Sequence, residues 1–205
     1  LTYQGLNLFI KISNCQTSGE INGTHNRTNY DLTRHTEYSK IDQVYLDPVT
    51  NEKYIPYIVE STYGLDRSFL AFMFEAYNKE TLEDGTEREV LKLHPFLAPY
   101  KVTILPLVKK IHSEKARQLE SKLSKYFMVN YDDSASIGKR YRRSDAIGTP
   151  FCITIDDETL NNNTVTIRDR DTMKQVTISI DEIVNYVEEK KNEVKKVEEN
   201  KKEPK

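Results

Sequence analysis

The pattern of apolar and polar residues predicts alternating strands and helices from residue 54 to residue 180. Short runs rich in β-branched and aromatic residues are typical of strands, whereas apolar residues spaced three and four apart are typical of helices. The predicted strands are 54–60, 101–105, 127–131, 151–155, 164–169 and 176–180. The predicted helices are 66–78, 109–126, 136–146 and a last one that begins near Asp181 as its N-cap.

The order of the elements after residue 100 predicts an α/β domain. Strands that alternate with helices are joined by right-handed crossovers, so we expect a largely parallel sheet with helices on its faces. The strand 101–105 is a nearly continuous apolar run, as expected when both faces of a sheet are covered. The last two predicted strands form a hairpin around Arg170 and Asp171.

Other segments have a weaker pattern. Residues 1–14 are mildly apolar without a clear period, and residues 19–50 are polar and predicted to be loop-like. The segment 81–88, which contains Asp84 and Gly85, is predicted to be a surface loop. After Tyr186 the composition changes to Lys, Glu, Asn and Val, which indicates a solvated helical tail.

Composition narrows the class of protein. The chain has 205 residues, of which 37% are hydrophobic and 30% charged, so it has room for one large domain or two small ones. It holds no long uncharged apolar run, and we expect no membrane span. Cys15 and Cys152 fit no metal or redox spacing, and no signal segment is recognised, which together favour a reducing cytoplasm. The chain begins with Leu1 rather than Met, so a longer parent protein is one expectation.

The net charge of −2 hides a gradient along the chain. Residues 1–95 carry −5, residues 96–180 carry +4, and residues 181–205 carry −1. A basic middle segment in an acidic protein favours a localised site for a polyanion. The alternative is chance, because four charges over that length are a weak signal.

Several long runs resemble one enzyme family. The run Glu60-Ser-Thr-Tyr-Gly-Leu-Asp-Arg67 resembles motif 3 of class II aminoacyl-tRNA synthetases. The run Asn26-Arg-Thr-Asn-Tyr-Asp-Leu32 and the segments 131–143, 148–156 and 165–173 are similar to the glycyl-tRNA synthetase version in particular. The resemblance covers about residues 19–184 and is to the C-terminal part of the homodimeric, bacterial-style form.

The resemblance implies a domain organisation. Residues 1–95 would be the C-terminal part of a class II catalytic domain, which is built on an antiparallel sheet. Residues 96–187 would be a mixed-sheet α/β anticodon-binding domain, and residues 188–205 a charged tail. The family's motifs 1 and 2 lie upstream of anything present here, so this chain alone is expected to be inactive.

The function implied by the resemblance is that of a glycine–tRNA ligase. Such an enzyme uses ATP with Mg²⁺ to activate glycine and transfers the glycyl group to glycine tRNA. This chain would supply motif 3 and anticodon recognition, within a cytoplasmic homodimer in the full-length protein. The alternative is a non-catalytic, synthetase-like paralogue that binds tRNA or another nucleic acid.

The resemblance also assigns roles to residues of the first half. The glycine-binding set is Glu60, Ser61, Thr62, Tyr63 and Gly64. The ATP-binding set is Glu20, Ile21, Gly64, Leu65, Asp66 and Arg67.

Two of these residues are expected to be catalytic. A carboxylate at Glu60 suits the ammonium group of glycine, and the planar cation of Arg67 suits stacking on adenine and contact with phosphate. The alternative for Glu60 is an ion pair with a neighbouring arginine. The family usually has Glu-Pro-Ser where this chain has Glu60-Ser61-Thr62. Glu20 is a further candidate for holding Mg²⁺, but the metal ligands remain unknown.

The basic helix gives the candidate RNA contacts. Clustered cations contact phosphates, and an interleaved aromatic residue such as Tyr141 can stack on an unpaired base. The predicted tRNA-binding residues are Lys139, Arg140, Arg142, Arg143 and Arg168. The alternative, which the sequence leaves open, is an ordinary solvated helix face.

Overall fold

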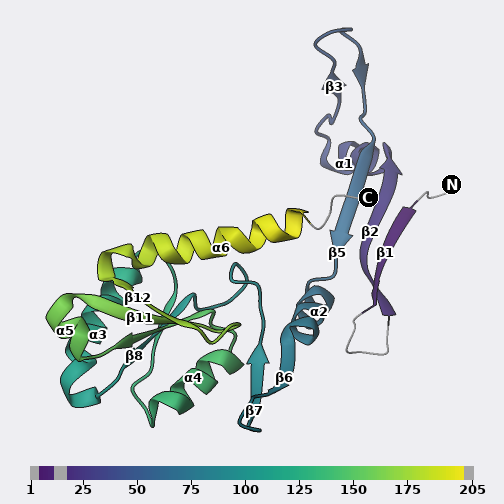
Figure 1. The fold of residues 1–205 in the computed structure, drawn as a ribbon. Helices are drawn as coiled ribbons and strands as arrows, with labels where there is room; N and C mark the ends of the chain where they lie inside the picture. The colour runs from purple at the N-terminus through teal and green to yellow at the C-terminus, as the bar shows by residue number, and fades with distance from the viewer. Residues whose placement is uncertain (1–4, 12–17, 201–205) are drawn as a thin grey trace. The chain divides into compact units, whose positions relative to one another are not determined.

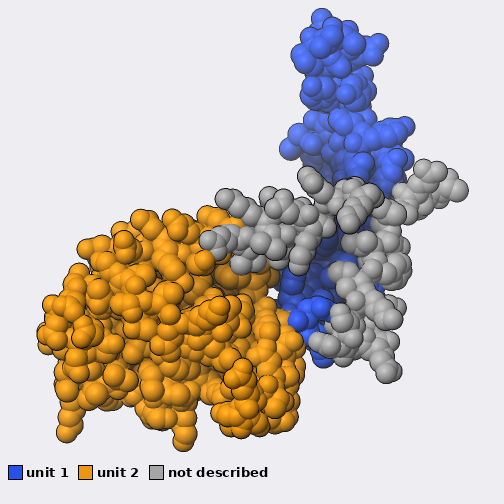
Figure 2. Space-filling model, viewed as in Figure 1, with its two compact units in different colours: residues 1–75 blue, residues 76–205 orange. Residues whose placement is uncertain are grey.

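A computed structural model describes residues 5–11 and 18–200 of the chain. The chain divides into two compact units, Leu1–Glu75 and Ala76–Lys205 (Figure 2). The sequence-based boundary between residues 95 and 96 lies within the second unit. Residues 201–205 of the predicted tail lie outside the described residues.

The first unit is built on a three-stranded antiparallel sheet with the strand order β1-β2-β5 (Figure 1). Its elements are β1 Gly5–Lys11, β2 Ser18–Thr28, α1 Tyr30–Ser39, β3 Tyr45–Leu46, β4 Lys53–Tyr54, β5 Ile58–Tyr63 and α2 Leu65–Ala76. The strand–turn–helix predicted around Gly64 is confirmed as β5 and α2. The strand itself begins after Pro56, because proline has no N–H to donate to a ladder.

The prediction of a loop over residues 19–50 is wrong, because this segment holds β2 and α1. Strand β2 is polar on both faces and therefore shows no alternation of apolar and polar residues. Its pairing with β5 makes it a strand. Local propensity is a weak guide where such tertiary pairing decides the conformation.

Residues 19–75 of the first unit form almost no hydrophobic core. Among residues 19–75, whose side chains the structure describes, Ala71 is the only buried apolar side chain. The exposed large apolar side chains of α2 are Leu65, Phe69, Leu70, Phe72 and Phe74. A helix that is apolar around most of its circumference is typical of a protein interior. The described part of this unit is therefore held mainly by backbone ladders and polar side chains.

The second unit contains a five-stranded mixed sheet with the order β12-β11-β10-β8-β9. The strands are β8 Val102–Pro106, β9 Val129–Tyr131, β10 Phe151–Ile155, β11 Thr164–Asp169 and β12 Gln175–Ser179. The helices are α3 Lys109–Leu123, α4 Ile137–Ala146, α5 Asp157–Asn162 and α6 Ile183–Asn200. The first three strands are parallel to one another, and β11 and β12 add an antiparallel hairpin. The predicted mixed-sheet α/β fold is thus confirmed for this unit.

The core of the second unit forms between this sheet and its helices. All five residues of β8 and all five of β10 are buried, which explains their continuous apolar runs. Helices α3 and α6 contribute Leu119, Leu123, Ile183 and Val187 to the same cluster. The second unit therefore has the kind of hydrophobic core that residues 19–75 of the first unit lack.

Three details of the second unit differ from the prediction. A hairpin of β6 Tyr77–Thr81 and β7 Glu87–Leu91 replaces the end of the predicted helix, and the predicted loop is its turn, over residues 82–86. Helix α5 was not predicted. The last helical run, which begins with the 3₁₀ turn Ile180–Glu182, has Ser179 rather than Asp181 as its N-cap, because the Ser179 hydroxyl and the Glu182 carboxylate form a capping box.

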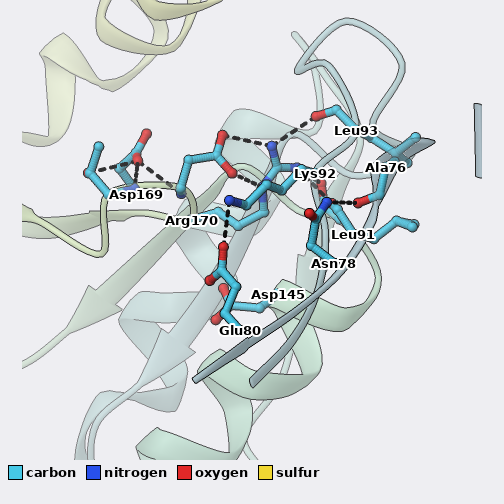
Figure 3. A network of polar contacts seen from close by, with 12 residues as sticks. Ala76, Asn78, Glu80, Leu91, Lys92, Leu93, Asp145, Asp169 and Arg170 are labelled. Carbon is cyan, nitrogen blue, oxygen red and sulfur yellow. Dashed lines mark hydrogen bonds and ion pairs between the residues drawn. The ribbon is translucent and has the colours of Figure 1, made fainter. Parts of the chain in front are cut away.

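A network of arginines and carboxylates joins the β6–β7 hairpin to the sheet (Figure 3). Arg88 of β7 lies 3.6 Å from the Asp145 carboxylate and donates to the Arg170 carbonyl at 2.8 Å. Arg168 of β11 contacts the same carboxylate at 2.8 and 3.1 Å. Although burial alone would lower the pKa of Arg168, the hydrogen bonds and charge of Asp145 raise it. Glu80 lies 3.3 Å from Arg88 Nε, so Asp145 is shared by two arginines and Arg88 has a second carboxylate beside it.

Arg170 extends this network through backbone acceptors. Its guanidinium donates to the carbonyl oxygens of Leu91 at 3.1 Å, Gly148 at 2.8 Å and Leu93 at 2.9 Å. Gly148 has φ of +81°, and a Cβ there would lie 3.0 Å from the Leu91 oxygen. Glycine is thus required where the end of α4 meets the hairpin.

We expect Asp145→Ala to lower the free energy of unfolding of the second unit by about 3–5 kcal/mol, because it leaves Arg168 buried without its counterion and Arg88 with Glu80 alone. The measurement is the urea midpoint of the purified chain, followed by circular dichroism. Asp181→Ala is the matched control, because that exposed carboxylate pairs only with Lys122 on the surface. Equal midpoints for the two variants would contradict the role assigned to the network.

Candidate functional site

A pocket of about 460 Å³ lies where β2 and β5 meet the start of α2. Its lining residues are Glu20, Ile21, Gly23, Thr62, Gly64, Leu65, Asp66 and Arg67. All six residues predicted to bind ATP are among them. The fold thus brings together two segments that are some forty residues apart in the sequence.

Two hydrogen bonds hold the turn after β5 against β2. The Gly64 N–H donates to the Ile21 carbonyl at 3.1 Å, and Arg67 Nη1 donates to the Glu20 carbonyl at 2.8 Å. A Cβ at Gly64 would meet only the Arg67 side chain, at 3.6 Å or more. Packing among the described residues therefore does not require glycine here, whereas a ligand close to the backbone would.

The chemistry of the pocket suits an anion. The first N–H groups of a helix have no partner within the helix and favour negative charge, and α2 begins in the pocket wall. The Arg67 side chain is exposed and makes one hydrogen bond among those described, which leaves other guanidinium N–H groups for a ligand. Glu20 and Asp66 add two carboxylates, oxygen ligands of the kind that Mg²⁺ takes beside phosphate.

The side chains of the predicted glycine-binding residues lie on two opposite faces of β5. Side chains of β5 alternate between its faces, so Glu60 and Thr62 share one face and Ser61 and Tyr63 the other. Thr62 and Gly64 line the pocket, whereas Ser61 is bonded to Asn22 on the opposite face. The structure therefore does not bring the Ser61 and Tyr63 side chains to the pocket.

Glu60 lies on the pocket face of β5 but outside the pocket lining. Its carboxylate is 3.5 Å from Arg27 Nε, and its side chain is 41% exposed. Arg27 makes shorter bonds, at 2.8 and 2.9 Å, to Asp31. The ion pair weighed as the alternative for Glu60 is thus present, although it is longer than the contacts between Arg27 and Asp31.

The five predicted tRNA-binding cations do not form one surface. Arg140 is 5% exposed and donates to the carbonyl oxygens of Ser134, Ala135 and Pro106. Arg168 is also buried, paired with Asp145. The structure therefore does not support Arg140 and Arg168 as RNA contacts, because their charges are used inside the protein.

Three of the predicted cations remain accessible. Lys139 is exposed, Arg142 is half-buried and reaches Thr86 at 3.3 Å, and Arg143 binds the Asp132 carboxylate at 2.6 Å. Tyr141, expected to stack on a base, is mostly buried and shares a hydrogen bond with the Thr154 hydroxyl at 2.7 Å. Its burial raises the pKa of the phenol. The basic helix thus offers cations but no stacking platform.

Sequence reasoning missed a second group of exposed polar residues. Ligands of α/β sheets commonly bind at the carboxyl ends of the parallel strands, which here are the ends of β8, β9 and β10. Near the carboxyl ends of these strands, the Arg117 guanidinium lies 3.4 Å from the centre of the Tyr131 ring, and Lys109 lies 3.1 Å from Asp133. The predicted parallel sheet was the signal that could have found this group, because the carboxyl ends of its strands lie at one edge.

The described residues contain neither a metal-binding cluster nor a membrane-spanning helix. No group of three or more His, Cys, Asp or Glu residues within 5–11 and 18–200 is arranged to hold a metal ion. None of the described helices is long and apolar enough to cross a bilayer. Cys152 is buried, and this burial raises the pKa of its thiol to about 12, so it is an unreactive core residue.

Comparison with known proteins identifies related chains for most of this sequence. The family described as Anticodon binding domain matches residues 101–190. The chain is 57% identical over 172 residues to a glycine–tRNA ligase of Clostridium tetani, 56% to one of Geobacillus kaustophilus and 54% to one of Alkaliphilus metalliredigens. Each match covers 84% of this chain but 37% of the relative. The chain therefore spans little more than a third of the length of these relatives.

We expect Arg140→Ala to lower the free energy of unfolding by about 1–3 kcal/mol, because buried carbonyl oxygens lose a charged donor. Thermal unfolding of the purified chain measures the loss. Lys139→Ala, which removes the adjacent but exposed cation, is the control and should unfold as the unmodified chain does. If both variants retain full stability, Arg140 is a surface cation and returns to the set of RNA candidates.

Proposed function

Since this chain is a homologue of class II glycyl-tRNA synthetases and matches their C-terminal portion, we propose that it carries the motif 3 part of a glycine–tRNA ligase active site together with the anticodon-binding module. The observation that carries the first half of this proposal is the pocket, which collects all six residues expected to contact ATP. The match of residues 101–190 to the Anticodon binding domain carries the second half.

The proposed reaction has two steps. A carboxylate oxygen of glycine attacks the α-phosphorus of ATP, which forms glycyl-adenylate and releases pyrophosphate. A hydroxyl at the 3′ end of the tRNA then attacks the glycyl carbonyl and releases AMP. The first step needs no general base, because the glycine carboxylate is already ionised at neutral pH. The protein therefore acts chiefly by orienting the substrates and stabilising charge.

The pocket residues have distinct roles in this proposal. Arg67 lies along the adenine and α-phosphate of ATP, held by its bond to the Glu20 carbonyl. The N-terminus of α2 faces phosphate oxygens. Glu20 and Asp66 are the carboxylates that would hold Mg²⁺ beside the phosphates.

The glycine site is proposed at the β5 end of the pocket. Thr62 supplies a hydroxyl, and Gly64 gives access to backbone. Glu60 is the proposed partner of the glycine ammonium group, in place of its 3.5 Å contact with Arg27. The side chains of Ser61 and Tyr63 are left out of the site, because they lie on the other face of β5.

The anticodon module is proposed to use exposed cations of the second unit. The set from α4 is Lys139, Arg142 and Arg143, and Lys109 and Arg117 at the strand ends extend it. Single-stranded anticodon bases present edges that such a module can read. In the full-length protein we propose a cytoplasmic homodimer.

A non-catalytic paralogue that only binds RNA is the less favoured alternative. A paralogue without catalytic activity would not need a pocket lined by all six residues that are expected to contact ATP, yet all six line this pocket. Domain limits at residues 95 and 187, with a charged tail from 188, remain part of the proposal.

We expect the triple variant Lys139→Ala, Arg142→Ala, Arg143→Ala to weaken binding of glycine tRNA by about tenfold or more, and to reduce its salt dependence, because each lost phosphate contact lowers the number of counterions released. Filter binding at several salt concentrations measures both effects.

The control for this variant removes the same charge from another surface of the same unit. Lys110→Ala, Lys122→Ala, Lys125→Ala changes three exposed lysines on and just after α3. If both triple variants lose the same affinity, binding depends on net charge alone and α4 is not the contact.

We expect the 205-residue chain alone to show no glycine-dependent exchange between pyrophosphate and ATP. The pocket has eight lining residues from two short segments, and the relatives supply further chain that is absent here. The complete enzyme of Clostridium tetani serves as the positive control in the same assay. Robust exchange by this chain would show that motif 3 and its surroundings suffice for adenylate formation.

A further inference from the structure

The alignment of β2 with β5 decides where the pocket residues lie. The pocket takes Glu20, Ile21 and Gly23 from one strand and Thr62 from the other. From Asn22 to Asn26, where β2 pairs regularly with β5, adjacent residues point to opposite faces, so a slip of one residue would turn each of these side chains away from its present partner. It would also move the Ile21 and Glu20 carbonyls away from Gly64 and Arg67. The geometry of the pocket is therefore a matter of strand register.

Hydrophobic burial does not set this register. Strand β2 contains a single large apolar residue, Ile21, and both of its faces are polar. Strands that are polar on both sides specify their register weakly. The ladder is also irregular at its far end, where the pairing shifts between Asn26 and Thr28 and Thr28 has φ of +53°.

Three polar side chains bridge the two strands on the face opposite the pocket. Asn22 Nδ2 donates to the Ser61 hydroxyl at 3.0 Å and to the Thr62 carbonyl at 2.9 Å. The Thr24 hydroxyl donates to Asn22 Oδ1 at 3.2 Å and lies 3.0 Å from the Ser61 hydroxyl. The three side chains thus form a closed ring of hydrogen bonds.

The ring of hydrogen bonds lies next to Thr62 and Gly23, two residues that line the pocket. Asn22 is 7% exposed, the only buried polar side chain among residues 19–75. Its amide reaches the backbone of Thr62, whose own side chain lines the pocket and donates to the Gly23 carbonyl at 3.3 Å. A buried amide that loses its partners costs free energy, so a slipped register would be penalised at this residue.

We propose that Asn22, Thr24 and Ser61 are positioning residues that lock β2 and β5 in the register that assembles the nucleotide pocket. They touch no ligand and act through Gly23, Thr62 and Gly64. The part of this inference that concerns the nucleotide rests on the proposed function, whereas the lock itself is a property of the two strands.

The test uses the isotope-labelled 205-residue chain and two measurements by NMR. The first is hydrogen exchange of the Gly64 amide, which reports its bond to the Ile21 carbonyl. The second is titration with ATP and Mg²⁺, followed at Gly64 and Arg67. We expect Asn22→Ala to speed Gly64 exchange by about tenfold and to weaken ATP binding by a similar factor, because two donor bonds are lost.

Matched variants separate positioning from general stability. Thr24→Val removes the hydroxyl with little change of shape and should have a smaller effect in the same direction, whereas Thr24→Ser keeps the hydroxyl and should restore unmodified behaviour. Asn26→Ala is the control, because Asn26 lies on the same face of β2 but its side chain bonds only the nearby Thr28 N–H. Amides of the second unit provide an internal reference for folding.

Each outcome decides the inference. Faster Gly64 exchange in Asn22→Ala and Thr24→Val, with Thr24→Ser and Asn26→Ala unchanged, supports the lock. Unchanged exchange in both Asn22→Ala and Thr24→Val overturns it, and so does equal acceleration in Asn26→Ala. If Asn22→Ala unfolds the first unit, the two Thr24 variants decide. If the unmodified chain binds no ATP, the proposed function fails on this pocket, while the exchange data still judge the lock.

Discussion

The buried carboxylate of Asp145 is the interaction on which the second unit depends. It has no exposed surface and lies between the guanidinium groups of Arg88 and Arg168, which come from the β6–β7 hairpin and from β11. Burying two cations is costly unless an anion and further acceptors accompany them. Here Arg88 also donates to the Arg170 carbonyl at 2.8 Å and lies 3.3 Å from the Glu80 carboxylate. The Asp145 charge on α4 thus contacts arginines of both the hairpin and the sheet and helps to join the three elements.

This constraint changes how the basic residues of the chain are interpreted. Clustered arginines in a sequence suggest RNA contacts, but a guanidinium with five donors is also the group best suited to several carbonyl oxygens at once. Arg140 serves that second purpose and Arg168 pairs with the buried Asp145 carboxylate, whereas Lys139, with a compact ammonium group, stays exposed. The positive charge of the middle segment thus divides between internal cohesion and accessible surface. Only the accessible part can contribute to binding a polyanion.

The elements that could be predicted from the sequence are those defined by their own apolar residues, and the rest depend on partners distant in the chain. Strands β8 and β10 were predictable because both of their faces are buried, and α3 because its apolar residues recur at helical spacing. Strand β2 was not, since its residues gain their conformation from pairing with β5. The pocket residues were identified through resemblance to motif 3, yet their division between two faces follows from the alternation of β5. The burial of Arg140 could not be predicted, because its acceptors include the Pro106 carbonyl, which is distant in the sequence.

The two units therefore hold their functional residues by different means. In the second unit a cluster of thirteen buried apolar side chains fixes the sheet, and loss of one surface cation leaves the others in place. In the first unit one apolar side chain is buried among residues 19–75, and a few hydrogen bonds between β2 and β5 set the shape of the pocket. Polar contacts of this kind are directional and individually weak, at about 1 kcal/mol net each. A pocket held in this way is defined by strand register rather than by packing, so a change that touches no ligand can still disassemble it.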